Sequence, residues 1–388
     1  MTSAADGPAY RRLEVGDPGP WFIQRTAHNP RFVIDVTGGR YIVLGFYGSS
    51  RDEAGSAAIA KIRANRHLFD DAKASFFGVA IDPSEESEGR APDMIPGIRT
   101  FFDFDFTISR LYGAAPHDAR PGDTEIPLRR FWIVLDPTLR VRHLFAFDDT
   151  DGLFASIAAL PPPELFAGIA LQAPILYLRD VFEPEFCRRL IDQYERHGGQ
   201  ESGFMREIDG KTVAIQDRSH KQRRDFHIAD DDLIAATRDR IRRHVVPEIK
   251  KVHQFEVTRM ERYLVCCYDA AEGGHFRAHR DNTTKGTAHR RFAVSINLND
   301  DFDGGEVSFP EYGPRSFKPP PGGAAVFSCS LLHAVSPVTR GRRYAFLPFL
   351  YDDAAARLRE ANNQFLGEGV GGYRAPDIAK QEETSRPS

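Results

Sequence analysis

With 388 residues, the chain exceeds the usual size of a single domain, so we expect two domains. Its net charge of −4 gives no overall attraction to nucleic acid or to an anionic membrane. The start of the chain (residues 1–8) is polar, and no later stretch reaches the length of a membrane span. The four cysteines form no disulfide framework, which suits a reducing compartment. We therefore expect a cytoplasmic protein that binds neither nucleic acid nor membranes.

The first part of the chain alternates short apolar runs with helical patterns. We predict strands at residues 41–46, 75–81, 131–135 and 141–147, the last two paired, and helices at 52–68 and from Asp151. Such alternation is typical of an α/β layer fold. Three consecutive prolines, Pro161 to Pro163, then end the pattern. We place the boundary there, with a first domain at 1–162.

Three motifs in this part carry a resemblance to a known family. They are the run 16–22 (Gly-Asp-Pro-Gly-Pro-Trp-Phe), the apolar run 39–44 ahead of a loop, and Arg130 before the strand that ends in Leu135-Asp136-Pro137. Together they resemble the peroxiredoxins. This resemblance implies a thioredoxin fold for the first domain.

The loop that would hold the peroxide-reducing cysteine departs from that family. After the strand ending at Phe46 and Tyr47 it reads Gly-Ser-Ser-Arg-Asp-Glu (48–53), and the first cysteine of the chain is Cys187. A serine hydroxyl of ordinary pKa cannot replace a peroxide-reactive thiolate. We therefore predict a redox-inactive domain without cysteine peroxidase activity, which docks a partner, presents a protein substrate or forms a homodimer.

Two helical patterns and a polar segment open the second part. One helix begins near Glu183, and a second begins at Asp231 and is bent or ended by Pro247. Between them, residues 200–221 are polar and contain glycine, so they form either a mobile lid over a site or a plain surface loop. The basic run 221–224 is most simply a solvated face, and the alternative is a surface that meets an acidic substrate.

His279 and Asp281 form the most informative pattern in the chain. If their segment is extended, residues two apart project from the same face, so an imidazole and a carboxylate can reach one ion. His333, in a later strand, would complete the two-histidine, one-carboxylate arrangement of Fe(II) oxygenases, which leaves open positions for chemistry. No neighbouring residue offers the fourth ligand of a structural zinc site.

Arg343 lies ten residues after His333, in a run that is typical of a buried strand. An inward-facing arginine needs an anionic partner, and its planar fork suits a carboxylate. We therefore assign Arg343 to the far carboxylate of a dicarboxylic cosubstrate whose other end chelates the metal. Tyr268 is a candidate hydroxyl donor to the same carboxylate. Arg342 leaves an ambiguity, because strand alternation sends one of the two arginines to solvent.

Other interpretations of these residues are weaker. His275 and His279 have the four-residue spacing of zinc-binding helices, but two glycines just before them argue against a helix. A His-Arg-Asp run also occurs in the catalytic loop of kinases, yet the asparagine expected five residues after the aspartate is Gly286 here. Glu306 either supports a metal ligand or lies on a surface turn.

A longer series of motifs surrounds the candidate ligands. In chain order it comprises Tyr268-Asp269, Gly273-Gly274-His275-Phe276, the run 291–299, Gly304-Gly305-Glu306, Pro320, Gly322, 325–327, 333–338 and Gly341. From about Pro174 to Asp353 the chain resembles the 2-oxoglutarate and Fe(II)-dependent dioxygenases of the prolyl 4-hydroxylase type. The resemblance implies a mainly-β double-stranded β-helix (jelly roll) with supporting helices at 163–366, and a tail follows at 367–388.

The same resemblance implies an enzyme with His279, Asp281 and His333 as metal ligands and with Arg343 and Tyr268 at the cosubstrate. It would use Fe(II), 2-oxoglutarate and O2, with ascorbate as a further candidate cofactor. The reaction would hydroxylate an unactivated C–H bond and release succinate and CO2. Family habit favours a protein or peptide side chain as substrate, although fold family does not fix substrate.

Two alternatives to that function stay open. One is hydroxylation of a small molecule, which would need a closed pocket instead of a long groove. The other is a non-catalytic scaffold or sensor in which both domains are degenerate. We favour a combination, in which an inactive peroxiredoxin-like half serves an active oxygenase half as sensor or adaptor.

Overall fold

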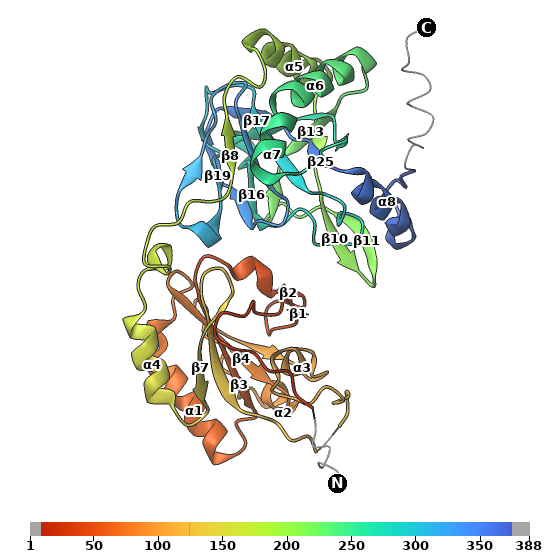
Figure 1. The fold of residues 1–388 in the computed structure, drawn as a ribbon. Helices are drawn as coiled ribbons and strands as arrows, with labels where there is room; N and C mark the ends of the chain where they lie inside the picture. The colour runs from red at the N-terminus through yellow and green to blue at the C-terminus, as the bar shows by residue number, and fades with distance from the viewer. Residues whose placement is uncertain (1–8, 124, 375–388) are drawn as a thin grey trace. The chain divides into compact units, whose positions relative to one another are not determined.

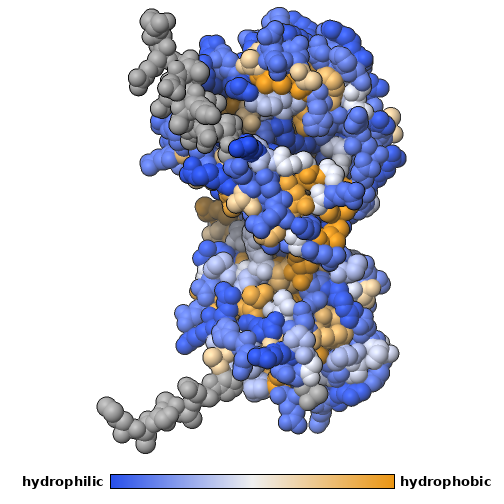
Figure 2. Space-filling view, turned by 90° about the vertical axis from the view of Figure 1, so that its right-hand side faces the viewer, coloured by the Kyte–Doolittle hydropathy of each residue, from blue (hydrophilic) through white to orange (hydrophobic). Residues whose placement is uncertain are grey.

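The computed structural model describes residues 9–123 and 125–374, which form two compact units. One unit runs up to Ala173 and includes Pro310–Pro314, and the other comprises the rest of the chain from Pro174. Within the described ranges, no helix has the length and apolar character that crossing a membrane requires. The face drawn in Figure 2 is mostly hydrophilic, with smaller apolar patches on each unit.

The first unit is an α/β fold around one five-stranded sheet (Figure 1). The strand order is β5-β4-β3-β6-β7, with β3 parallel to β4 and antiparallel to β6. Its elements are β1 (Ile23–Gln24), β2 (Phe32–Val33), β3 (Tyr41–Gly48), α1 (Glu53–Ala64), β4 (Ala74–Ala80), α2 (Ser84–Ser87), β5 (Ile98–Phe102), α3 (Thr107–Tyr112), β6 (Phe131–Leu135), β7 (Val141–Ala146) and α4 (Thr150–Ala159).

Alternation along the fully buried strand β3 fills a core on each face of this sheet. Ile42 and Leu44 belong to the cluster that includes α3, whereas Tyr41 and Val43 belong to the cluster that includes α1 and α4. A sheet with helices packed on both faces confirms the predicted thioredoxin-like α/β fold. The four predicted strands are β3, β4, β6 and β7. Strand β5, a short edge strand that pairs with β4, was not predicted from the sequence.

The second unit is a double-stranded β-helix, as predicted. Its larger sheet follows the path β14-β25-β17-β24-β15-β13-β9, with β21 joined to β17 and β8 joined to β21, and its smaller sheet follows β12-β16-β22-β19-β20. The helices are α5 (Pro184–His197), α6 (Asp231–His244), α7 (Val246–His253) and α8 (Asp353–Ala361). The strands are β8 (Leu176–Leu178), β9 (Gln200–Glu201), β10 (Phe204–Ile208), β11 (Lys211–Ile215), β12 (Lys221–Gln222), β13 (Arg224–His227), β14 (Arg259–Glu261), β15 (Leu264–Asp269), β16 (His275–His279), β17 (Phe292–Asn297), β18 (Asp303–Gly304), β19 (Val307–Ser308), β20 (Ser316–Phe317), β21 (Ala324–Ser328), β22 (His333–Val335), β23 (Val338–Arg340), β24 (Arg342–Phe346) and β25 (Phe349–Tyr351).

Helices α5, α6 and α7 pack on one face of the larger sheet. Leu190 of α5, Ile241 of α6 and Ile249 of α7 are buried in one cluster with Val294 and Phe346 of the sheet. A proline at the start of α7 separates it from α6, as predicted. Because the helices take this face, the opposite face of the sheet is left to line the interior of the β-helix.

Residues 200–221 form β9 and the hairpin β10–β11, so the prediction of a plain surface loop is wrong. The hairpin is anchored at the buried Thr212, whose Oγ1 accepts a hydrogen bond of 2.9 Å from the amide of Gly286 and whose carbonyl accepts one of 2.8 Å from Gly367. A role as a lid stays a prediction. The predicted tail, 367–388, lies outside the described residues from 375 onward.

Candidate metal centre and its pocket

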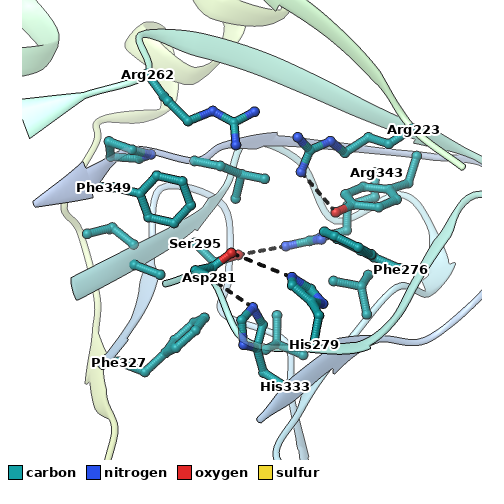
Figure 3. A pocket seen from close by; sticks show the side chains of 17 residues that line it. Arg223, Arg262, Phe276, His279, Asp281, Ser295, Phe327, His333, Arg343 and Phe349 are labelled. Atoms are coloured by element: carbon teal, nitrogen blue, oxygen red, sulfur yellow. Dashed lines mark hydrogen bonds and ion pairs between the residues drawn. The ribbon is translucent and has the colours of Figure 1, made fainter. Parts of the chain in front are cut away.

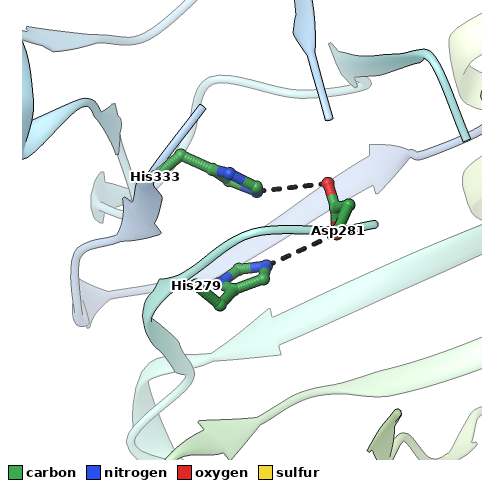
Figure 4. Close-up of side chains that lie close together, drawn as sticks. All are labelled: His279, Asp281 and His333. Carbon is green, nitrogen blue, oxygen red and sulfur yellow. Dashed lines mark ion pairs between the residues drawn. The ribbon is translucent and has the colours of Figure 1, made fainter. Parts of the chain in front are cut away.

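Two strands of the smaller sheet bring the two candidate histidines together. His279 ends β16, and its register partner across the antiparallel pair with β22 is His333. Asp281 follows β16 by two residues, and its amide donates to the carbonyl of Cys329 at 2.9 Å. The candidate ligand atoms of the three side chains all lie within 4.8 Å of one another (Figure 4). The strand pairing therefore produces the grouping that the spacing predicted.

Both imidazoles are fixed in one orientation. Nδ1 of His279 lies 2.8 Å from the carbonyl of Arg277, and Nδ1 of His333 lies 3.0 Å from the carbonyl of Leu331. A carbonyl can only accept, so each Nδ1 carries the proton and each Nε2 keeps its lone pair. Those Nε2 atoms lie 3.6 Å and 3.4 Å from the two carboxylate oxygens of Asp281.

The charge states suit metal ligands. Burial, reinforced by the neighbouring His333, lowers the pKa of His279 to about 4. Burial acts to raise the pKa of Asp281, but attraction to His333 and His279 in their protonated forms outweighs it, and the pKa lies well below its usual value. At neutral pH the site thus offers a neutral imidazole and a carboxylate, the states that a metal ion requires.

Arg343 and Tyr268 form the opposite side of this centre. Arg343 is 1% exposed, and its Nε and Nη2 donate to Asn297 Oδ1 and Ser295 Oγ, each at 2.9 Å. Within the described residues, its buried Nη1 has no hydrogen-bond partner. The guanidinium carbon lies 5.3 Å from the ring centroid of Tyr268. Arg342, by contrast, is exposed, which settles the ambiguity between the two arginines.

The pocket between these groups has about 500 Å³ of empty space, part of it open to solvent (Figure 3). Aromatic rings flank the histidines, with Phe276 stacked on His279 at a centroid distance of 3.5 Å and Phe327 4.7 Å from His333. A two-histidine, one-carboxylate donor set is the one that non-haem Fe(II) uses. The unpaired Nη1 of Arg343 can donate a hydrogen bond to the far carboxylate of a dicarboxylate whose other end binds the metal. The residues therefore fit both an Fe(II) ion and 2-oxoglutarate.

The basic run 221–224 departs from its predicted solvated face. Lys221 and Arg223 are each 4% exposed, and Arg223 lines the pocket together with Arg262. The physical reason is that β12 pairs with β16, which carries residues 221–223 inside the β-helix and leaves only Arg224 of the run exposed. Neither arginine was a predicted site residue, although contact with an acidic substrate was the alternative prediction for the run that contains Arg223.

The remaining candidates lie apart from the grouped ligands. His275 lies on strand β16 rather than on a helix, and its Nδ1 contacts the carbonyl of Gly273 at 2.7 Å. Glu306 accepts a hydrogen bond of 3.0 Å from Ser336 Oγ. Neither belongs to the group of side chains that could share one ion.

In the first unit, the loop after β3 holds a carboxylate network. Buried Glu85 accepts hydrogen bonds from the Ser50 amide at 2.8 Å and from the Tyr47 hydroxyl at 3.2 Å. Arg130 Nη1 donates a hydrogen bond of 2.9 Å to the carboxylate of Asp52. This loop thus contains neither a thiol nor a free guanidinium to polarise a peroxide.

Comparison with known proteins finds a family match for part of the second unit. Residues 263–351 match the family model of the 2OG-Fe(II) oxygenase superfamily. The match spans the oxygenase segment from β15 to β25, which includes all three candidate ligands, Arg343 and Tyr268.

Among curated proteins, the chain is similar over part of its length to PKHD-type hydroxylases. One from Cupriavidus metallidurans is 38% identical over 95 residues, which cover 22% of this chain and 42% of that protein. One from Paracoccus denitrificans is 43% identical over 83 residues, which cover 19% of this chain and 37% of that protein. The chain thus spans about two fifths of the length of these relatives.

Two solved structures resemble the two units at low identity. A prolyl-4-hydroxylase from Pseudomonas putida is 17% identical, with a TM-score of 0.35, and the match covers 46% of this chain and 93% of that chain. The peroxidoxin BcpB from Mycobacterium tuberculosis is 20% identical, with a TM-score of 0.32, and the match covers 39% of this chain and 99% of that chain.

Proposed function

We propose that the second unit is an Fe(II)- and 2-oxoglutarate-dependent dioxygenase that hydroxylates an unactivated C–H bond. The observation that carries this proposal is the convergence of His279, Asp281 and His333 beside the orphaned Nη1 of Arg343. In the reaction, one oxygen atom of O2 enters the C–H bond and the other enters succinate, while 2-oxoglutarate loses CO2. Fe(II), when bound, supplies the position where O2 and 2-oxoglutarate meet.

The residues of the chain would bind and orient these partners. His279, Asp281 and His333 would hold the metal, and Arg343 with Tyr268 would hold the far carboxylate of 2-oxoglutarate. Phe276 and Phe327 cover the imidazoles and limit the access of water. The names of the curated relatives support hydroxylation as the reaction.

We further propose a protein or peptide side chain as the substrate, with ascorbate as an auxiliary reductant, in the cytoplasm. The free thiol state of all four cysteines suits a reducing compartment. For the first unit we propose docking or homodimerisation in place of peroxide reduction. Sedimentation of the full chain over a range of concentrations tests the dimer, and a constant monomer mass would contradict it.

The first experiment is anaerobic visible absorption of the metal-free chain on addition of Fe(II) and then 2-oxoglutarate. We expect a weak charge-transfer band in the wild type and none in Asp281→Ala. Glu306→Gln is the matched control, because that carboxylate lies outside the candidate ligand group. If the wild type gives no band and calorimetry detects no binding of either partner, the dioxygenase proposal fails.

A further inference from the structure

The pocket wall contains more positive than negative charge. Arg223 and Arg262 share one oxygen of Asp225, with Nη2 to Oδ2 distances of 2.7 Å and 3.2 Å. Lys221 lies beside them, and its ammonium donates to Ser202 Oγ at 2.7 Å and to the carbonyl of Gly203 at 2.6 Å. Two arginines therefore share one carboxylate, while burial lowers the pKa of Lys221 beside them well below its usual value. A buried excess of cations is costly unless an anion joins them.

Arg223 is incompletely satisfied. It is 4% exposed, and besides Asp225 it donates from Nη1 to the Tyr268 hydroxyl at 3.3 Å. Its Nε is buried and has no hydrogen-bond partner among the described residues. A buried donor without a partner destabilises the folded state, and a bound acceptor would remove this cost.

Arg262 reaches the pocket through an unusual backbone conformation. It lies between β14 and β15 with φ of +68°, in the left-handed region that non-glycine residues rarely adopt. Such strain is concentrated at functional sites. The conformation places the guanidinium 5.5 Å from the ring centroid of Phe349, at the pocket, with 26% of the side chain exposed. Arg262 is thus the cation of this wall that an entering molecule can contact.

Arg262 is distinct from the cosubstrate clamp, whereas Arg223 contacts the clamp through the Tyr268 hydroxyl. Arg343 is bonded to Ser295 and Asn297, whereas Arg262 and Arg223 are bonded to Asp225. Figure 3 shows Arg262 and Arg223 on the side of the pocket opposite His279 and His333. 2-Oxoglutarate has two carboxylates, and the metal and Arg343 account for both.

We propose that the substrate carries a carboxylate that binds Arg262, with Arg223 behind it, while 2-oxoglutarate occupies Arg343. The inference rests on the proposed dioxygenase function and narrows it to acidic substrates. The oxidised C–H bond would lie a few bonds from the carboxylate, because Arg262 and the candidate metal ligands line the same pocket. A planar guanidinium fork over an aromatic ring is suited to such a group.

The test uses acetate as the probe of this wall. The full chain is loaded with Mn(II) in place of Fe(II) and saturated with 2-oxoglutarate, and the relaxation of the acetate methyl protons is measured as acetate is added. We expect saturable enhancement in the wild type. We expect acetate binding at least tenfold weaker in Arg262→Gln and partly retained in Arg262→Lys. Arg224→Gln is the matched control, since Arg224 is exposed and pairs with Glu272.

The outcomes separate this inference from the proposed function. The wild type and each variant are first checked for the absorption band that Fe(II) and 2-oxoglutarate produce. Absence of this band in the wild type would contradict the proposed dioxygenase function. An intact band without acetate enhancement would overturn only the carboxylate site. Equal enhancement in the wild type and in Arg262→Gln would show acetate on the metal and would also overturn it. Arg262→Gln is preferred to a change at Arg223, whose buried ion pair endangers folding.

The same titration distinguishes two sources of the carboxylate. N-acetyl-proline represents a free acid, and a blocked tripeptide with one aspartate represents an acidic peptide. The compound that displaces acetate at the lower concentration identifies the source. If neither is held more tightly than acetate, the wall is an adventitious anion site and the inference falls.

Discussion

Tyr268 of β15 and Arg343 of β24 are direct register partners, and both side chains turn into the pocket. The next pair along the same ladder, Asp269 and Arg342, instead forms an ion pair of 2.8 Å with half of the Arg342 side chain exposed. Because side chains alternate along a strand, one step separates the cosubstrate pocket from the outer surface. This pair of arginines therefore offers an internal control.

Replacing Arg343 should weaken 2-oxoglutarate binding far more than replacing Arg342. Removal of one partner from a buried charge pair costs about 3 kcal/mol, so Arg343→Gln should raise the Kd by about 100-fold. Arg342→Gln should change it less than about twofold, because an exposed ion pair contributes little. Calorimetry of the Mn(II)-loaded chain measures both. Equal effects of the two substitutions would contradict the assignment of the clamp.

Glu261 should be essential for the stability of the second unit. It is buried and accepts from Arg290 Nε at 2.7 Å and from Arg359 Nη2 at 2.9 Å, and His289 Nε2 lies 3.2 Å away. Glu261→Gln leaves these cations without a counter-charge, so we expect a loss of about 3 kcal/mol in the free energy of unfolding. The control is Asp303→Asn, in an exposed pair with Arg340, which should cost less than about 1 kcal/mol. Urea titrations measure both, and similar losses would refute the prediction.

The cysteines should be inert in the folded chain. Burial raises the pKa of Cys187 to about 11 and that of Cys267 to about 12, and it also raises those of Cys266 and Cys329. We expect no reaction with a disulfide reagent until urea is added, and no consumption of hydrogen peroxide with a thiol reductant. Ser56→Cys, at an exposed position of α1, is the positive control. A wild-type thiol that reacts as fast as this variant would contradict the prediction.

The ion pair at the start of α1 should stabilise the first unit only above acidic pH. Asp52 caps α1, and the hydrogen bonds from Arg130 lower its pKa to about 2 from an unfolded value of 3.8. A depressed carboxyl pKa gives stability that is present above the unfolded pKa and is lost as the pH falls toward the folded one. Asp52→Asn keeps the cap, so it should cost about 0.5–1 kcal/mol at pH 7 and less at pH 3. Urea unfolding at both pH values measures this, and a larger cost at pH 3 would be inconsistent with it.

Local patterns predicted part of this site, and long-range geometry decided the rest. The spacing of His279 and Asp281 is local, so their common direction was accessible from sequence. Alternation along β24 predicted that one of Arg342 and Arg343 turns inward, and the structure shows that it is Arg343. Arg262 was not, because its left-handed backbone conformation leaves no signature in a non-glycine residue. Arg223 was weighed only as part of a basic run, because its burial depends on pairing of β12 with a strand far along the chain.

The pairing of His279 with His333 links metal binding to the stability of the folded protein. Strands β16 and β22 comprise five and three residues, and an ion held between them would fasten one to the other. A ligand that binds only the folded state shifts the folding equilibrium by mass action. Scarcity of the ion would then enlarge the unfolded fraction that proteases remove. The amount of this protein in a cell would accordingly follow the supply of the metal as well as the rate of its own synthesis.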